Sequence, residues 1–387
     1  MLETSAIDSF LRKSLRQIRA GATAPWPVDC PPQPGSLGVW ERIEFHGVAL
    51  LFHAASGKLQ DWPQQLLDRI GEEARLMALW EATHRKALAK LIEALASQDI
   101  VSVLMKGTAI AYSLYDDPAA RRRGDSDLLV QPEDIDRVRS TLEKCGWYRN
   151  DDPHGLTHQE GWLFDSAGAF THALDLHWET SDRPAICSVL PRADLFASRQ
   201  QLPALSPAAE RAEIPLILIH EAINQKWHET RGYWTDQGRI KGARRLIWSV
   251  DFDLMANAMT NSEWQRLIEL CAKHGIGPLI VEALSNAQDD LQITLPSEPL
   301  GELARQTHKP EIMEYFAASD DFDEFLLKLR DAPGWKARIN LVLDRGFPPP
   351  QHLRSKYPEQ ASWPTAALQA RLLMEAAGRM IRRVAAR

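Results

Sequence analysis

Cysteine is scarce in this sequence of 387 residues, and long apolar runs are missing. The four cysteines, Cys30, Cys145, Cys187 and Cys271, are far apart and form no C-x-x-C pair, which argues against a zinc finger and a disulfide framework. No stretch approaches the roughly 18 apolar residues that a membrane span requires. The amphipathic first residues also lack the uninterrupted apolar core of a secretion signal. We therefore expect reduced thiols, no membrane partner and a cytoplasmic location.

An excess of positive charge is also missing. Asp and Glu number 52 against 45 Lys and Arg, which gives a formal net charge of −7. Because the average surface would repel nucleic acid, general affinity for nucleic acid is not expected. A basic helix expected over residues 368–387 leaves a local contact with RNA open. With 44% hydrophobic residues the chain can bury a sizeable core, and its length is sufficient for two or three domains.

Kinase motifs are absent as well. The sequence has neither a G-x-G-x-x-G loop nor an H-R-D segment, which argues against a phosphotransferase of the kinase type. It also shows no internal repeat at a fixed period.

Helical patterns dominate both ends of the chain. Apolar spacing predicts a helix over residues 7–19, and a stretch rich in Leu, Ala, Glu, Arg and Lys predicts one or two long helices within 62–97. The proline-rich segment 24–38 is expected to be a loop. Further helices are expected over residues 208–227, 239–259, 262–271 and 277–286. We thus predict an N-terminal helical region, 1–98, and a C-terminal helical region, 184–387.

Residues 99–183 have a different character. Short β-like runs surround two helix-like segments; these runs are residues 101–105, 128–130, 161–164 and 170–176. The second helix-like segment runs from Pro132 to Cys145. Proline is common in the first turn of a helix, and Gly146 is a plausible residue to end it. This order predicts an α+β fold, in which a small mixed β-sheet carries helices on one face between the two helical regions.

Two aspartates one residue apart, Asp125 and Asp127, stand at the start of one predicted strand. Because side chains alternate along a strand, both carboxylates project from the same face. Asp175 lies within another apolar run, where a charged residue is costly to bury unless it is paired or bound to metal. Mg²⁺ prefers carboxylate oxygen, and two Mg²⁺ ions ~3.5–4 Å apart can support nucleotidyl transfer. The three acids therefore predict a metal site that acts on a nucleoside triphosphate.

A turn that can bind phosphate precedes these acids. Lys106, Gly107 and Thr108 follow the first predicted strand and offer backbone N–H groups at a helix start, where anions are favoured. Lys106 and Arg123 are the candidate cations for neutralising phosphate charge. Arg123 belongs to the run Arg121–Arg123, which has a second interpretation as a solvated face.

This part of the sequence resembles the uncharacterised bacterial nucleotidyltransferase family of the polymerase-beta-like superfamily. Members of that family show a lysine-glycine turn, a Y-x-x-P-x-x-R-x-x-x-D-x-D-L-L-V block and a later D-L-H-W segment. The corresponding residues here are Lys106-Gly107, residues 115–130 and residues 175–178. The resemblance is strongest from residue 100 to residue 178 and extends weakly into the helical part that follows.

The resemblance implies a small nucleotidyltransferase core that moves a nucleoside monophosphate group to an acceptor not identified by the sequence. Asp125 and Asp127 would be the metal-binding pair, and Asp175 the third acid. The sequence departs from the broader superfamily at one place, because Gly107-Thr108 stands where a glycine-serine or glycine-glycine turn is usual. The branched threonine side chain narrows this turn.

Simpler interpretations of the same residues stay open. Asp125 and Asp127 can be loop residues whose negative charge interacts with the dipole of a nearby helix. Asp175 can be a buried partner of Arg121 or Arg123. The whole protein can likewise be a catalytically degenerate nucleotidyltransferase fold that acts as a nucleotide-binding or protein-interaction module. A helical interaction protein is the third alternative, but it leaves the three acids unexplained.

Three further residues have no assigned role. His177 either orients a substrate beside the carboxylates or is a satisfied histidine at a strand end. His220 and Asp251 stand among apolar neighbours on predicted helices. We expect them to pair with each other or with a basic residue in a structural network.

Overall fold

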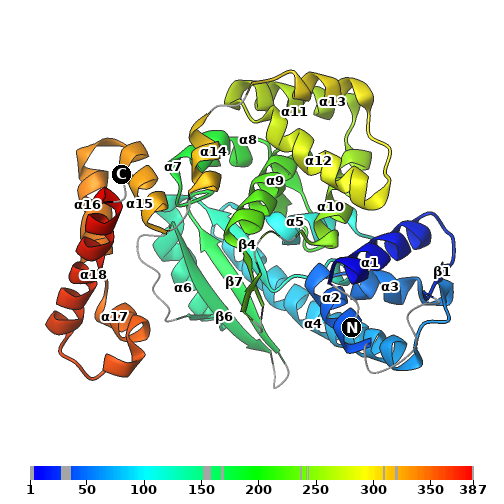
Figure 1. Ribbon diagram of the computed structural model, residues 1–387, viewed down its shortest axis with the longest axis horizontal. Helices are drawn as coiled ribbons and strands as arrows, with labels where there is room; N and C mark the ends of the chain where they lie inside the picture. Colours follow the sequence, from blue (N-terminus) through cyan, green and yellow to red (C-terminus); the bar gives the residue numbers. More distant parts are fainter. Residues whose placement is uncertain are drawn as a thin grey trace.

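The computed structural model describes residues 4–27, 36–150, 158–166, 170–235, 238–240, 242, 244–307, 310–318 and 321–385. Helices form most of this part of the chain and surround one large β-sheet (Figure 1). Within these ranges, the structure contains no helix that combines the length and the apolar character needed to cross a membrane.

The large sheet has seven strands. In chain order they are β3 (Ser102–Met105), β4 (Asp125–Val130), β5 (Tyr148–Arg149), β6 (Gln159–Ser166), β7 (Phe170–His177), β8 (Gln200–Gln201) and β9 (Glu210–Arg211). Their order in the sheet is β5-β6-β7-β4-β3-β9-β8. Because β4 is antiparallel to β3 and parallel to β7, the sheet is mixed. The predicted α+β class, with a mixed sheet flanked by helices, is confirmed.

Strand β4 is covered on both faces, whereas the sequence led us to expect helices on one face. Leu128 and Leu129 point to opposite faces because they are adjacent in the strand, and both are fully buried. The burial of both faces explains why β4 ends in a continuous apolar run rather than an alternating one.

The helix expected over residues 208–227 begins later, as α9 (Ile214–Arg231). Glu210 and Arg211 instead form β9, which pairs with β8 and β3. Pro215 stands in the first turn of α9, where a missing N–H leaves no helical hydrogen bond unmade. Helical spacing upstream of this proline was therefore misleading, because pairing with distant strands decided the structure.

The helix expected over residues 239–259 also begins later, as α10 (Leu246–Ala258). Residues 238–240 form β11, which is antiparallel to β10 (Tyr233–Thr235) in a separate hairpin. This hairpin connects α9 to α10 and places Tyr233 beside the start of α10.

The segment 24–38 is only partly irregular, contrary to the sequence-based expectation. Ala24 and Pro25 form β1, which is parallel to β2 (Leu59–Gln60), and a two-stranded edge tolerates a proline. Helix α2 (Ser36–His46) begins within the same segment. Residues 28–35 lie outside the described chain.

The N-terminal helices pack around their own apolar cluster and are joined to the sheet by one long helix. They comprise α1 (Thr4–Arg19), α2, α3 (Ala49–Ala54) and α4 (Gln64–Ala96). In α4, Leu66 and Ile70 belong to the N-terminal cluster, whereas Leu88 and Leu91 belong to the core around the sheet. The expected one or two helices are thus a single helix of 33 residues that enters both cores.

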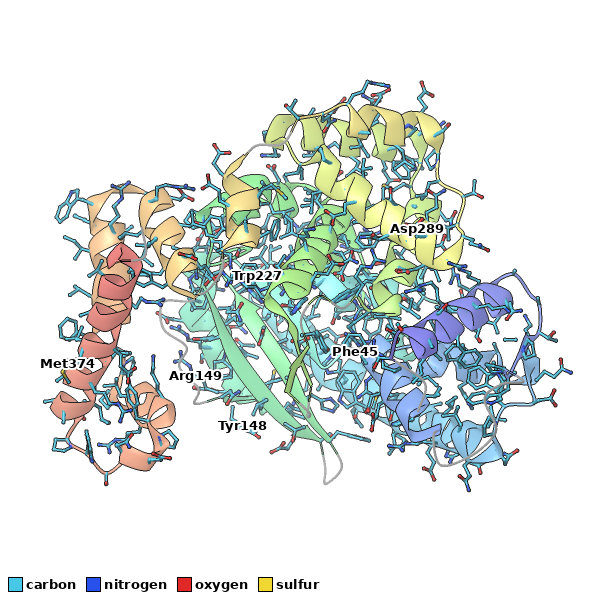
Figure 2. The ribbon with its side chains drawn as sticks, viewed as in Figure 1. Phe45, Tyr148, Arg149, Trp227, Asp289 and Met374 are labelled. Carbon is cyan, nitrogen blue, oxygen red and sulfur yellow. The ribbon has the colours of Figure 1, made fainter. Side chains whose placement is uncertain are left out.

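The remaining helices cover the sheet or follow it. They are α5 (Lys106–Leu114), α6 (Ile135–Cys145), α7 (Pro184–Val189), α8 (Arg192–Ala197), α11 (Asn261–His274), α12 (Gly277–Leu291), α13 (Ser297–Ala304), α14 (Pro310–Ala317), α15 (Asp321–Asp331), α16 (Gly334–Gly346), α17 (Pro350–Lys356) and α18 (Thr365–Ala385). The last of them, α16 to α18, stand apart at one side of the molecule (Figure 1). Met374 on α18 is 67% exposed and marks this outlying part in Figure 2.

Candidate functional site

The pairing of β4 with β7 brings the predicted acids together. In the parallel register Asp127 stands opposite Asp175, and Asp125 stands opposite Ala173. Because side chains alternate along each strand, Asp125 and Asp127 share one face with Asp175 and His177. Asp127 and Asp175, 48 positions apart in sequence, thus lie next to each other on adjacent strands.

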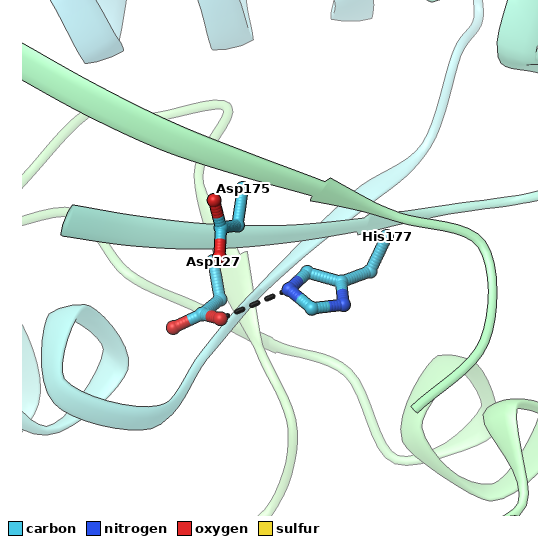
Figure 3. Close-up of side chains that lie close together, drawn as sticks. All are labelled: Asp127, Asp175 and His177. Atoms are coloured by element: carbon cyan, nitrogen blue, oxygen red, sulfur yellow. Dashed lines mark hydrogen bonds and ion pairs between the residues drawn. The ribbon is translucent and has the colours of Figure 1, made fainter. Parts of the chain in front are cut away.

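Asp127, Asp175 and His177 form a group that can hold a metal ion (Figure 3). One ligand atom from each residue lies within 4.8 Å of the others. His177 Nε2 is 2.9 Å from Asp127 Oδ1 and donates a hydrogen bond to it, which fixes the orientation of the ring. Two carboxylates and an imidazole are a suitable donor set for a divalent cation. The sequence left the role of His177 open, although its position two residues after Asp175 placed it on the same face.

The three carboxylates are electrostatically crowded. Burial and then repulsion from Asp127 and Asp125 raise the pKa of Asp175 to about 7. Burial and repulsion from Asp127 also raise the pKa of Asp125. The pKa of Asp127 is lowered despite its burial, because Lys106 and His177 stabilise the ionised form. A divalent cation would relieve this repulsion, so the charges present fit a metal site.

Lys106 begins α5 and contacts the acids directly. Its ammonium Nζ donates to Asp127 Oδ1 at 2.5 Å, and its backbone has a positive φ of 47°. Burial lowers the pKa of Lys106, but attraction to Asp127 outweighs burial and leaves the pKa raised. The positive charge of Lys106 is therefore maintained beside the acids at neutral pH.

Gly107 and Thr108 complete the turn between β3 and α5. A Cβ atom at Gly107 would lie 2.8 Å from Arg121 Nη1, so the turn requires glycine for close packing. Thr108 is buried, and its hydroxyl shares a hydrogen bond of 2.8 Å with Ser126, on the face of β4 opposite Asp127. Because no side chain caps the start of α5, what the turn offers to an anion is its backbone N–H groups.

The arginine run is paired with carboxylates rather than a solvated face, and two of its three members are buried. Arg121 donates to Asp251 Oδ2 at 2.8 Å, and Arg123 Nη2 lies 2.6 Å from Glu81 Oε2. Arg121 and Arg123 are 6% and 9% exposed. The alternative that Asp175 pairs with Arg121 or Arg123 is therefore wrong, because their carboxylate partners lie on α10 and α4.

Asp251 and His220 lie on α10 and α9. Asp251 pairs with Arg121 and accepts a hydrogen bond of 2.7 Å from Tyr115, so it belongs to a buried network with a basic residue. His220 is buried, and burial followed by repulsion from Lys106 lowers its pKa to about 3. It is therefore neutral in the folded protein at ordinary pH.

A cavity of about 310 Å³ lies against Lys106, Gly107, Asp125 and Asp127. Its other wall comes from α9, the β10–β11 hairpin and the start of α10. The residues of this helical wall are Asn224, His228, Tyr233, Arg245 and Trp248. No sequence motif marks this wall, because only tertiary packing brings its residues to the turn.

Comparison with known proteins points to one family. Residues 38–292 match the model of a family described as uncharacterised nucleotidyltransferase. Among solved structures, the chain is similar to an antigenic nucleotidyltransferase-like protein from Paracoccidioides brasiliensis, with 14% sequence identity and a TM-score of 0.30. That similarity covers 60% of this chain and 96% of the other. No curated protein gives a match. The family match includes the seven-stranded sheet and both walls of the cavity.

Proposed function

The chain belongs to this family of uncharacterised nucleotidyltransferases, and we propose that it moves a nucleoside monophosphate group from a nucleoside triphosphate to an acceptor with the help of divalent metal. The observation that carries the proposal is the register of β4 and β7, which sets Asp127 beside Asp175 and His177 at a cavity lined by Lys106 and Gly107. A strand pair of this kind supplies ligands on a rigid base.

In this proposal Asp125, Asp127 and Asp175 hold two divalent ions, with Mg²⁺ as the expected metal. When bound, such ions activate an attacking oxygen and neutralise the charge of the leaving pyrophosphate. His177 keeps Asp127 oriented through its hydrogen bond of 2.9 Å. If its Nε2 nitrogen gave up its proton and the hydrogen bond to Asp127, it would make the group suitable for metals that accept imidazole, such as Mn²⁺ or Zn²⁺.

The turn before α5 is assigned to the triphosphate. The backbone N–H groups of Gly107 and Thr108 and the ammonium of Lys106 are its candidate donors, and Arg123 adds positive charge from the same wall. An acceptor hydroxyl attacks the α-phosphorus and gives up its proton to solvent. The bond from the α-phosphorus to the bridging oxygen breaks, and pyrophosphate leaves.

A catalytically degenerate fold that only binds nucleotide is the second candidate. It is favoured by one contact, since Lys106 Nζ already lies 2.5 Å from Asp127 Oδ1, the oxygen that also accepts from His177. A metal ion at this oxygen would compete with the ammonium. The two candidates differ in one outcome, because only the first forms a covalently nucleotidylated product.

Incubation of the protein with α-labelled nucleoside triphosphates, Mg²⁺ and a cell extract as the source of acceptor tests the proposal. We expect label transfer by the wild type and none by the double variant Asp125→Asn with Asp127→Asn. Asp136→Asn is the matched control, because Asp136 is an exposed acid on α6. No transfer with any of the four nucleotides, together with nucleotide binding in calorimetry, would instead establish the degenerate fold.

A further inference from the structure

The helical wall of the cavity contains one arginine, Arg245, that differs from the other cations of the cavity in its contacts with carboxylates. Lys106 and four arginines line the cavity. Four of these cations contact a carboxylate: Lys106 contacts Asp127, Arg121 contacts Asp251, Arg122 contacts Glu73 and Arg123 contacts Glu81. Arg245 contacts no carboxylate in the described part of the chain. Its positive charge therefore remains available to a ligand.

Arg245 is held rigidly. Its Nε donates to the carbonyl oxygen of Phe45 at 2.6 Å, and its Nη1 donates to the hydroxyl of Tyr233 at 3.1 Å. The guanidinium lies 4.5 Å from the centre of the Tyr233 ring and 5.8 Å from that of the Trp248 ring. Phe45 lies where the N-terminal helices meet the rest of the molecule (Figure 2). These neutral contacts fix the side chain without cancelling its charge.

The burial of this charge is costly without an anion. Arg245 is 7% exposed, and its burial lowers its pKa, with a smaller lowering from Arg121 and Arg122; Tyr233 and the more distant carboxylate of Asp251 act in the opposite direction without restoring the pKa. A buried cation is normally paired with a carboxylate or another anion. The missing partner at Arg245 thus points to an anion that arrives with a ligand.

Gly47 provides the space that Arg245 occupies. A Cβ atom at this position would lie 2.8 Å from Arg245 Nη2, and the backbone φ of +69° also favours glycine. The guanidinium is therefore positioned by a residue nearly 200 positions away in sequence. Nη2 makes no hydrogen bond with the described residues and remains free to donate to a ligand oxygen.

We propose that Arg245 binds the β- and γ-phosphates of the nucleoside triphosphate across the cavity from Asp125 and Asp127. This inference rests on the proposed function and names a residue that the sequence motifs do not contain. With Nε and one N–H of Nη1 donated to Phe45 and Tyr233, Nη2 and the second N–H of Nη1 are left to donate to phosphate oxygens. The metal-facing acids, by contrast, cannot contact a phosphate without a cation between them. The same contact would hold pyrophosphate as it leaves.

Calorimetry on the full-length protein with Mg²⁺ tests the inference without requiring the acceptor. The probes are the α,β-methylene analogues of the four nucleoside triphosphates, the four monophosphates and inorganic pyrophosphate. For Arg245→Gln we expect the affinity for the triphosphate analogue and for pyrophosphate to fall about ten- to hundredfold, as the loss of a charged hydrogen bond predicts. We expect monophosphate affinity to stay unchanged.

Two other variants keep the test decisive if Arg245→Gln folds poorly. Arg245→Lys retains the charge without the fork, and we expect an intermediate loss of triphosphate affinity. Arg244→Gln is the matched control, since Arg244 is the neighbouring arginine, pairs with Asn286 and lies outside this cavity. Its affinities should equal those of the wild type.

The outcomes separate the inference from the function on which it rests. If the wild type binds none of the triphosphate analogues, the proposed function fails and the inference fails with it. If the wild type binds and Arg245→Gln binds equally well, only the inference is overturned. An equal loss of triphosphate and monophosphate affinity would also overturn it, because Arg245 would then contact the nucleoside or the fold rather than the β- and γ-phosphates.

Discussion

Two groups of acids, one on β4 and β7 and the other on α9 and α10, lie near the turn formed by Lys106 and Gly107, and their surroundings differ. Asp127 belongs to the first group, in which Asp125, Asp127 and Asp175 share one lysine, and Asp125 and Asp127 line the cavity. Asp251 belongs to the second group, in which Arg121 and Tyr115 donate to both of its oxygens. Three acids around one cation suit metal binding, whereas an acid whose oxygens are all hydrogen-bonded suits a scaffold. Burial and negative charge alone do not distinguish the two.

The largest expected effect comes from removing one acid of the cavity group. Under the proposed function, Asp175→Asn should reduce nucleotide transfer by about three orders of magnitude or more, equivalent to about 4 kcal/mol in activation free energy, because the proposed metal site loses a ligand. The unfolding midpoint without metal at pH 8 should stay equal or rise, since repulsion from Asp127 and Asp125 is relieved. Label transfer and thermal melting in a chelator measure the two effects. Transfer at the wild-type rate would contradict the metal role of Asp175.

Removing Asp251, the acid of the scaffold group, should instead lower the stability of the fold. Asp251→Asn should lower the free energy of unfolding by about 3–5 kcal/mol, because it leaves the buried Arg121 guanidinium without the carboxylate that accepts its hydrogen bonds. Urea denaturation measures the loss. Replacement of both partners, Asp251→Leu with Arg121→Met, should recover part of it, since no buried charge is left unpaired. An unchanged unfolding free energy for Asp251→Asn would contradict the distinction between the groups.

Glu221 is a second acid near Arg121 in the scaffold group, and unlike Asp251 it accepts no hydrogen bond from the described residues. It is fully buried on α9, its oxygens have no hydrogen-bond partner among the described residues, and Arg121 Nη2 lies 3.7 Å away. Burial, only partly offset by attraction to Arg121, raises its pKa from 4.5 to about 7. At a pH between 4.5 and 7, Glu221 is therefore mostly protonated in the folded protein and mostly ionised in the unfolded chain.

The stability of the wild type should therefore fall as the pH rises from about 4.5 to above 7, by about 3 kcal/mol for this group. Glu221→Gln cannot titrate, so its unfolding free energy relative to the wild type should increase over the same window. Urea titrations at pH 5 and pH 8.5 measure this change. Glu133→Gln, at an exposed acid, is the control and should follow the wild type. If the unfolding free energy of Glu221→Gln shows the same pH dependence as that of the wild type, Glu221 is not protonated in the folded state.

The smallest of these effects concerns the turn near which the two groups lie. Gly107→Ala places a Cβ atom 2.8 Å from Arg121 Nη1, and overpacking of this kind costs about 1–3 kcal/mol. Thermal unfolding measures the cost. Gly57→Ala is the control, because no atom lies within 4 Å of its added Cβ. Equal stabilities of the two variants would show that Arg121 can move away from the turn freely.

The cavity acids were accessible to sequence reasoning because a strand has a fixed period of two residues. This period predicted that Asp125 and Asp127 share a face, and the structure places Asp175 beside them. Arg245 and Tyr233 could not be predicted in the same way. Tyr233 lies between the helices predicted over 208–227 and 239–259, in a hairpin that was not predicted, and Arg245 lies within the second predicted helix, which in the structure begins only at Leu246.

The arginine run shows a second limit of sequence reasoning. Consecutive arginines usually indicate a solvated face, and nothing near Arg121 or Arg123 in sequence announces a partner. Their carboxylates come from Asp251 and Glu81, which are 130 and 42 positions away. Pairs of this kind depend on which helices pack together, and helical spacing alone does not determine that.

Helix α4 makes the sheet inseparable from the helices before it. The same helix carries Glu73 and Glu81, the partners of Arg122 and Arg123, and its N-terminal half lies in another apolar cluster. A fragment that contained only the sheet would retain both arginines without their counter-charges. The molecule is therefore cooperative at this junction, and the cavity wall and the N-terminal helices should acquire and lose protection from hydrogen exchange as one unit.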